Sequence, residues 1–146
     1  MSNLVFRRVL TTDDTYKKVF DLREDVLRKP IGLSLHNEDL SDEVNDHILV
    51  AEQGDDLLGC LILTPKGNGT LQLRQMAVSS KVHGQNIGRQ LVDYAEMYAQ
   101  ENDCNKIILH ARMVAKGFYE KLHYIVTSDM FTEVGIPHVV MEKQLS

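Results

Sequence analysis

A loop with two glycines, VHGQNIGRQL at residues 82–91, is the first segment whose residue types could do chemistry. It lies between a strand-like and a helix-like run, and the start of a helix carries unpaired N–H groups and a partial positive charge. Gly84 and Gly88 leave room for an anion, and Asn86 tolerates the left-handed backbone that a third glycine would otherwise supply. The pattern indicates a phosphate-binding turn, although a strand-to-helix turn that binds nothing has the same composition.

Three arginines stand where a charged side chain needs an anionic partner. Arg23 falls on the apolar stripe of the first helical run, and an inward arginine is costly unless it meets an anion. Arg74 and Arg112 lie toward one side of the predicted sheet, near the ends of two strands. Together the three fit bidentate binding of a carboxylate or phosphate. Structural salt bridges are the alternative, because acidic residues are in excess.

Tyr119 and His138 are the side chains best suited to move protons. Tyr119 falls off the apolar stripe that Val114, Phe118 and Leu122 form on a short helical run, which favours a functional tyrosine over a packed one. His138 begins the last strand, and histidine often serves as a general base near neutral pH. A capping or exposed histidine is the alternative. The other histidines show no ligand spacing, so we expect no metal site. They are His36, His47, His83, His110 and His123.

The periodicity of apolar residues predicts the elements that position these side chains. The expected strands span 4–10, 47–52, 57–64, 70–78, 105–111, 124–131 and 138–144. The expected helices lie between Asp14 and Pro30, at 87–101 and at 114–122. The unit from 70 to 111 must be a right-handed crossover between parallel strands. The order predicts an α/β (α+β) fold, with a mixed central sheet of about six to seven strands, helices on both faces and a single domain over 1–146.

Composition limits the possible partners. The chain has 146 residues and a formal net charge of −5, which argues against nucleic acid because phosphate binding needs clustered basic residues. Cys60 and Cys104 have no CxxC spacing and suggest free thiols in a reducing compartment. The first residues lack a stretch apolar enough for a signal peptide, and nothing later suggests a membrane span. A cytoplasmic location is therefore expected.

Three separated segments resemble one protein family. LRQMAVSSKVHGQNIGRQLVDYAE resembles motif A of the GNAT superfamily of N-acetyltransferases, and HARMVAKGFYEKLHY resembles its motif B. MFTEVGIPHVVMEKQL is similar to the same segment of ElaA-like acetyltransferases, and all three together are similar to glyphosate N-acetyltransferases. The order of elements agrees over nearly all of residues 3–144. The resemblance implies the GNAT fold and an acetyl-coenzyme A-dependent N-acetyltransferase.

The resemblance also implies where acetyl-coenzyme A, the cosubstrate, is held. Its pyrophosphate would meet backbone N–H groups of the loop, and its pantetheine arm would pair with the strand that precedes the loop. His83 stands where the family has arginine or glutamine, which removes a fixed charge. The implied cofactor-binding residues are Met76, Ala77, Val78, His83, Gly84, Gln85, Asn86, Ile87, Gly88 and Arg89.

In the implied reaction His138 deprotonates an amine, the amine attacks the thioester directly in a ternary complex, and Tyr119 protonates or stabilises the leaving thiolate. Arg23, Arg74 and Arg112 would hold a small anionic acceptor, such as an amino acid or its phosphonate analogue. Two alternatives stay open: acetylation of protein lysines or N-termini, and a non-catalytic acyl-coenzyme A-binding module. A homodimer that exchanges the last strands is possible in this fold.

Overall fold

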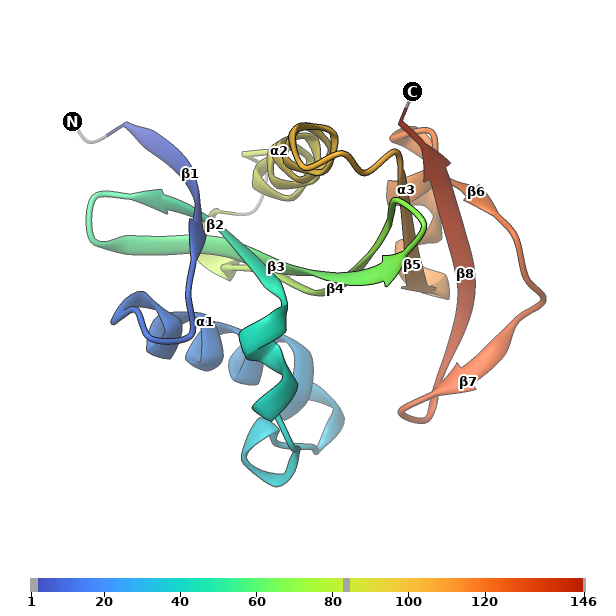
Figure 1. Ribbon diagram of the computed structural model, residues 1–146. Helices are drawn as coiled ribbons and strands as arrows, with labels where there is room; N and C mark the ends of the chain where they lie inside the picture. Colours follow the sequence, from blue (N-terminus) through green and yellow to red (C-terminus); the bar gives the residue numbers. More distant parts are fainter. Residues whose placement is uncertain (1–2, 83–84, 146) are drawn as a thin grey trace.

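The computed structural model describes residues 3–82 and 85–145 as strands and helices in the predicted order (Figure 1). Three α-helices occur in this part of the chain: α1 (Thr15–Arg23), α2 (Ile87–Glu101) and α3 (Lys116–Lys121). A π-helical turn, η1 (Glu24–Arg28), extends α1. The strands are β1 (Leu4–Val9), β2 (His47–Gln53), β3 (Asp56–Gly67), β4 (Thr70–Val78), β5 (Lys106–Arg112), β6 (Ile125–Val126), β7 (Phe131–Glu133) and β8 (Ile136–Gln144).

All these strands join one mixed sheet in the order β1-β2-β3-β4-β5-β8-β6, with β7 also paired to β8. The β4–β5 pair is parallel and the others are antiparallel. Helix α1 covers one face of the sheet and α2 the other (Figure 1). The predicted fold class is confirmed, and the sheet has one strand more than the upper estimate.

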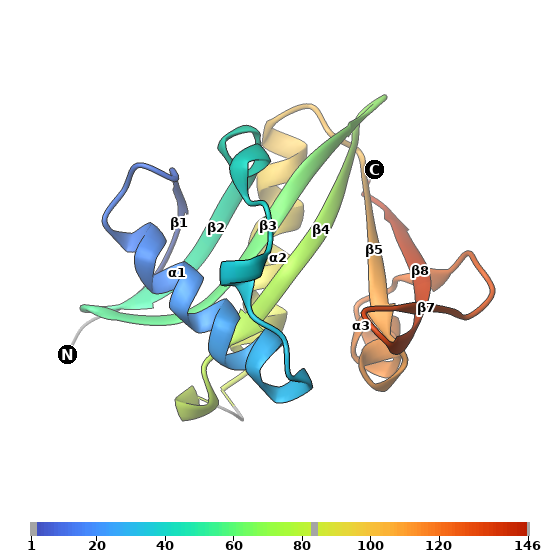
Figure 2. The same cartoon turned by 90° about the horizontal axis from the view of Figure 1, so that it is seen from below.

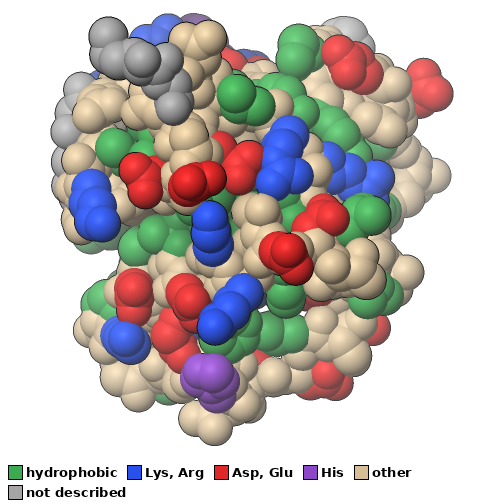
Figure 3. Space-filling view, turned by 90° about the vertical axis from the view of Figure 1, so that its left-hand side faces the viewer, with side chains coloured by type: hydrophobic (Ala, Val, Ile, Leu, Met, Phe, Trp, Pro, Cys, Tyr) green, Lys and Arg blue, Asp and Glu red, His purple; other side chains and the backbone are tan. Residues whose placement is uncertain are grey.

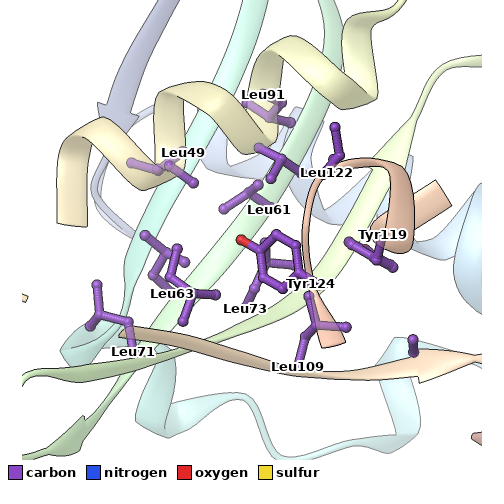
Figure 4. Packing of buried hydrophobic residues seen from close by; sticks show 14 of the residues in the cluster. Leu49, Leu61, Leu63, Leu71, Leu73, Leu91, Leu109, Tyr119, Leu122 and Tyr124 are labelled. Atoms are coloured by element: carbon purple, nitrogen blue, oxygen red, sulfur yellow. The ribbon is translucent and has the colours of Figure 1, made fainter. Parts of the chain in front are cut away.

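Successive side chains of the central strands point to opposite faces of the sheet, which divides the core into two layers. Ile48 and Val50 of β2 belong to the cluster beneath α1, whereas Leu49 belongs to the larger cluster beneath α2. Figure 4 shows Leu61 and Leu91 in this larger cluster, between the sheet and α2. Because both faces are covered, the middle strands are buried on both sides and read as continuous apolar runs.

Gly59 of β3 lets α2 approach the sheet closely. A Cβ at this position would lie 3.3 Å from the carbonyl oxygen of Ala77 and 3.3 Å from Cγ2 of Ile87. Those two contacts are tighter than ordinary packing, so a side chain here would push the first turn of α2 away from β4. The absence of a side chain therefore fixes the start of α2 beside the end of β4.

Strands β4 and β5 separate halfway along their length. Their parallel pairing runs from Thr70 opposite Lys106 to Leu73 opposite Leu109 and ends there. On the other edge of β4, Ile62 lies opposite Arg74 and Cys60 opposite Ala77, so β4 contains one extra residue between these pairs. This bulge bends β4 away from β5, and Figure 2 shows the two strands diverging.

The first helix stops before Pro30, as predicted: α1 ends at Arg23 and η1 at Arg28, and Pro30 lies in a separate 3₁₀ turn, η2 (Lys29–Ile31), at a position where no amide hydrogen is needed. Two local features differ from the sequence-based expectation. The predicted strand 124–131 divides into β6 and β7. Val114, expected to point inward, is 94% exposed because it lies in a 3₁₀ turn, η6 (Met113–Ala115), ahead of α3.

Charge is spread over the surface. Figure 3 shows acidic and basic side chains interspersed on the face it presents, without a continuous basic patch there. None of the helices in the described residues is long and apolar enough to cross a membrane.

Candidate active site

A pocket of about 420 Å³ opens where β4 and β5 diverge. Its volume is within the usual range for small-molecule sites. Its wall combines the end of β4, the end of β5, the β7–β8 hairpin, α3 and the segment that follows α1. Four of the five side chains that the sequence predicted for proton transfer and acceptor binding line it: Arg74, Arg112, Tyr119 and His138.

Strand register places several of these side chains on one face. Arg112 of β5 lies directly opposite His138 of β8, and Phe131 of β7 lies opposite His138 on the other edge. His110 and Glu133 are each two residues from one of these positions, so they project to the same face. The pocket face of this end of the sheet therefore carries two imidazoles and a carboxylate beside Arg112.

His138 is almost completely buried and has a defined tautomer. Its Nδ1 lies 2.7 Å from the carbonyl oxygen of Ile136. A carbonyl oxygen can only accept, so Nδ1 carries the hydrogen, and Nε2 of the neutral ring has a free lone pair. Nε2 lies 3.7 Å from Oε2 of Glu133, whose Oε1 lies 2.9 Å from Nδ1 of His110. A proton that arrives on Nε2 would therefore face a carboxylate.

Tyr119 is packed, contrary to the expectation that it would stand clear of the apolar stripe. It is 7% exposed, belongs to the core cluster and lines the pocket, because α3 begins only at Lys116 and its apolar face is turned accordingly. Its ring meets Phe118 and Tyr124 edge to face, and Figure 4 shows it on α3 beside Leu122. Burial raises the pKa of Tyr119 to about 12, so its hydroxyl stays protonated at neutral pH.

Arg23 lies apart from the pocket. Its side chain is fully buried beneath the sheet, and its guanidinium donates to both carboxylate oxygens of Glu43 at 2.9 and 2.7 Å. The hydroxyl of Tyr16 also donates to Glu43, at 2.6 Å. Burial raises the pKa of Glu43, but the hydrogen bonds from Arg23 and Tyr16 outweigh it and leave that pKa below its ordinary value. Glu43 thus supplies the anion that Arg23 requires, and the structure does not bring Arg23 to the other two arginines.

Arg28 is the third arginine that lines the pocket, beside Arg74 and Arg112. It ends the π-helical turn, lines the pocket and pairs with Glu38 through Nε at 2.6 Å and Nη2 at 3.3 Å. Nη1 of Arg28 and Nη2 of Arg112 each lie 3.4 Å from the carbonyl oxygen of Leu27, so the two guanidiniums are neighbours. The sequence contained this arginine, but a regular 3.6-residue period does not represent the wider π turn that directs it.

Arg74 and Arg112 differ in how far they are already paired. Nη1 of Arg74 lies 3.3 Å from the hydroxyl of Thr64 and 3.9 Å from a carboxylate oxygen of Asp46. Arg112 has no carboxylate within salt-bridge distance among residues 3–82 and 85–145. Its charge is therefore available to an incoming anion.

The start of α2 has the features of an anion site. Asn86 is its N-cap and has left-handed backbone angles (φ 58°, ψ 28°). No side chain among the described residues makes a capping hydrogen bond to the start of this helix. The first turn contains no acidic residue. Gly88 packs on Phe118 and Val78, which ties the helix start to α3 and to the end of β4. Arg89 is exposed, and Ile87 is buried against the sheet.

The remaining predicted cofactor residues fall into three groups. Met76 lines the pocket, while Ala77 and Val78 continue β4 beyond its last pair with β5. The N–H of Gln85 already donates to the carbonyl oxygen of Val82 at 3.3 Å. His83 and Gly84 lie outside the described residues. Within the part of the chain that is described, no group of three or more residues could hold a metal ion.

Known proteins match this chain over nearly its full length. The family model for the acetyltransferase (GNAT) domain matches residues 21–145. A relative from Bacillus subtilis (strain 168), named "Putative acetyltransferase BSU40680", is 30% identical over 139 residues, which is 92% of this chain and 93% of the relative.

Solved structures of acetyltransferases are also similar to this chain. A "putative N-acetyltransferase from Lactobacillus plantarum" has a TM-score of 0.86 at 26% identity, covering 99% of this chain and 98% of that one. Escherichia coli ElaA has a TM-score of 0.83 at 16% identity, covering 97% and 100%, and therefore shares the fold. A GNAT family acetyltransferase from Elizabethkingia anophelis with acetyl-CoA bound has a TM-score of 0.73 at 17% identity, covering 99% of both chains. The chain belongs to the GNAT acetyltransferase family and is an acetyl-coenzyme A-dependent N-acetyltransferase.

Proposed function

We propose that this enzyme transfers the acetyl group of acetyl-coenzyme A to the amine of a small anionic acceptor, such as an amino acid or a phosphonate analogue. The observation that carries the proposal is the convergence of Arg28, Arg74 and Arg112 on the pocket that His138 and Tyr119 also line. Arg28 replaces Arg23 in the acceptor site that the sequence suggested, because Arg23 is buried away from the pocket in an ion pair with Glu43.

Backbone groups would hold acetyl-coenzyme A. The uncapped first turn of α2 offers N–H groups and the positive end of a fifteen-residue helix to the pyrophosphate. Beyond Leu73 the edge of β4 faces the space that β5 has left, and the pantetheine arm can pair with it there. This arrangement directs the thioester to the pocket beside Met76, whose backbone N–H would polarise the carbonyl. The donors at the helix start do not depend on His83.

His138 would act as the general base. An alkyl ammonium has a pKa of about 10.4, so the amine must lose a proton before it can attack. Nε2 of neutral His138 has the lone pair to receive that proton, because Nδ1 is committed to Ile136. The charge that develops on the ring lies 3.7 Å from the carboxylate of Glu133. A general base of this kind contributes about 10²–10⁴-fold to the rate.

Tyr119 would stabilise the leaving sulfur. With a pKa of about 12, its hydroxyl is a weaker acid than a thiol, whose ordinary pKa is about 8.5. Complete proton transfer from Tyr119 to the thiolate is therefore uphill, and a hydrogen bond donated to the thiolate is favoured. No covalent intermediate on the enzyme is needed, because amine and thioester meet in the same pocket.

The acceptor's anionic group would bind between Arg28 and Arg112. Two adjacent guanidiniums repel each other, and a carboxylate or phosphonate placed between them relieves that repulsion while making bidentate hydrogen bonds. Glu38 is paired with Arg28, and Glu133 is the other carboxylate that lines the pocket. The three arginines outnumber these two carboxylates, so the pocket keeps a net positive charge for an anionic acceptor, although the protein as a whole carries −5.

An acceptor screen tests this proposal. Thiol release from acetyl-coenzyme A is measured with amino acids, aminophosphonates and the decarboxylated amine of each amino acid. We expect the anionic acceptors to have the higher kcat/KM. For them Arg112→Gln should raise the acceptor KM by about tenfold or more, with little change for the decarboxylated amines.

Arg7→Gln is the matched control, because Arg7 of β1 is paired to Glu52 of β2 and lies outside the pocket. A best acceptor without an anionic group would overturn the assignment of the arginines. Activity only on protein amines, or binding of acetyl-coenzyme A without turnover of any amine, would favour the two alternative functions.

A further inference from the structure

Two arginine–glutamate pairs join the first helical region to the segment that follows it, and they differ in their access to solvent. The side chains of Arg23 and Glu43 are 0% and 6% exposed, so this pair is closed to any ligand. The side chains of Arg28 and Glu38 are 9% and 37% exposed, and both residues line the acceptor pocket. A carboxylate that is already partly hydrated loses little when it leaves its partner. An incoming anion can therefore open the pair of Arg28 and Glu38.

Glu38 occupies donors of Arg28 that an anionic acceptor would use. Its two carboxylate oxygens accept from Nε and Nη2 of Arg28 at 2.6 and 3.3 Å, which is a bidentate arrangement. The other terminal nitrogen of Arg28 lies 3.4 Å from the carbonyl oxygen of Leu27, which Nη2 of Arg112 also approaches. Glu38 thus neutralises one of two neighbouring guanidiniums with a carboxylate that belongs to the protein itself.

The segment that carries Glu38 is anchored by contacts other than this ion pair. Leu35, three residues earlier, is 1% exposed, and its N–H donates to Oε1 of Glu24 at 3.0 Å. The hydroxyl of Ser34 donates to Oε2 of Glu24 at 2.7 Å. Because these contacts hold the backbone, the side chain of Glu38 can leave Arg28 by rotation about its own bonds.

We propose that Glu38 is an internal competitor for Arg28, which an anionic acceptor displaces before both guanidiniums hold it. This inference rests on the proposed function, and it adds a residue that sets the affinity for the acceptor. The exchange keeps Arg28 paired, because its guanidinium passes from the carboxylate of Glu38 to the anion of the acceptor while Glu38 turns into water. An amine without an anionic group brings nothing to replace Glu38. Glu38 therefore weakens the binding of anionic acceptors specifically.

Glu38→Gln tests the competition, because it keeps the size of the side chain and removes its charge. For the best anionic acceptor it should lower the KM in the thiol-release assay by about three- to tenfold, with kcat nearly unchanged. For the decarboxylated amine the KM should stay within about twofold of wild type. In an Arg28→Gln background, Glu38→Gln should not lower the KM, because the guanidinium that it competes for is gone. An equal decrease there would indicate general charge repulsion and overturn the role of Glu38.

A thermal shift with inorganic phosphate tests the same exchange without turnover. At constant ionic strength, phosphate should raise the Tm of Glu38→Gln more than that of wild type, because Arg28 is then open to the anion. Asp25→Asn is the matched control. It removes one negative charge from the helical turn that also contains Arg28, but Asp25 pairs with Lys29 at 2.8 Å and lies outside the pocket. This control should keep the wild-type KM and the wild-type phosphate shift.

The two assays separate failure of this inference from failure of the proposed function. If the acceptor KM of Glu38→Gln is unchanged or higher, the pair only holds the segment after α1, and the role of Glu38 is wrong while the proposed function stands. If wild type acetylates no anionic amine, the proposed function fails. The phosphate shift then decides alone: a larger shift in Glu38→Gln supports competition for Arg28, and an equal shift overturns it.

Discussion

The buried pair of Arg23 and Glu43 gives a direct test of whether Arg23 is structural. Arg23→Met removes the guanidinium and keeps most of the apolar stem. It leaves the Glu43 carboxylate, whose side chain is 6% exposed, with Tyr16 as its remaining donor. Removing one partner of a buried ion pair costs about 3–5 kcal/mol. Glu43→Gln should cost a similar amount, because it strands the guanidinium.

These free energies correspond to a large change in melting temperature. Unfolding entropy is about 2.1 cal/mol/K per residue, or about 0.3 kcal/mol/K for a chain of 146 residues. A loss of about 4 kcal/mol should therefore lower the Tm by about 13 °C. The double variant Arg23→Met/Glu43→Leu removes both charges and should recover most of the stability, because apolar replacement of a buried pair is often neutral.

The pH dependence of the unfolding free energy tests the contribution of the Arg23–Glu43 pair independently. The pKa of Glu43 is below its ordinary value of 4.5 in the folded protein. The pair therefore stabilises the fold fully above about pH 4.5 and loses its contribution as the pH falls through the folded pKa. Wild type should lose stability over this acid range more steeply than the double variant, as seen in urea denaturation at each pH.

Steady-state kinetics decide between the two roles of Arg23. Below its Tm, the double variant should keep the KM values for acetyl-coenzyme A and for the best acceptor within about threefold of wild type. An unchanged Tm for Arg23→Met together with a tenfold higher acceptor KM would refute the structural reading. It would return Arg23 to the acceptor site.

Two further variants test the proton-transfer residues. Tyr119→Phe should lower kcat by about tenfold or more, with the KM for acetyl-coenzyme A nearly unchanged. In the wild-type protein, phenolate absorbance from Tyr119 should appear only near pH 12. A wild-type kcat in this variant would exclude a role in thiolate departure. Glu133→Gln should lower kcat by about three- to tenfold, a modest effect because this carboxylate is half-exposed. In a His138→Gln background it should have no further effect, and additive losses would show that Glu133 does not act through His138.

The fold could be predicted because its elements have clear periods. Buried strands appear as apolar runs, and α2 shows a strong apolar face, so their order and the parallel crossover follow from simple rules. The division of the predicted strand 124–131 was missed although the sequence signalled it, because Thr127, Ser128 and Asp129 between β6 and β7 form a cluster typical of a loop. Val114 was misplaced for a different reason: a 3₁₀ turn ahead of α3 shifts the helical phase.

The candidate site was only partly predictable. Arg74 and Arg112 follow from strand direction, because residues at the carboxyl ends of parallel strands meet at one edge of the sheet. Arg23 and Arg28 could not be told apart, since the pairing of Arg23 with Glu43 joins segments twenty residues apart and the π turn changes which side chain faces the pocket.

The two halves of the site also depend on different parts of the chain. Acetyl-coenzyme A would be bound mainly by backbone groups at the start of α2 and along β4, which any sequence that keeps the bulge, the left-handed Asn86 and the small Gly59 can present. The acceptor would be bound by side chains, those of Arg28, Arg74 and Arg112. Substitution of side chains can therefore change the acceptor without disturbing the cosubstrate. The match to the acetyltransferase (GNAT) family model thus identifies the acetyl donor, and only the pocket side chains carry information about the amine that receives it.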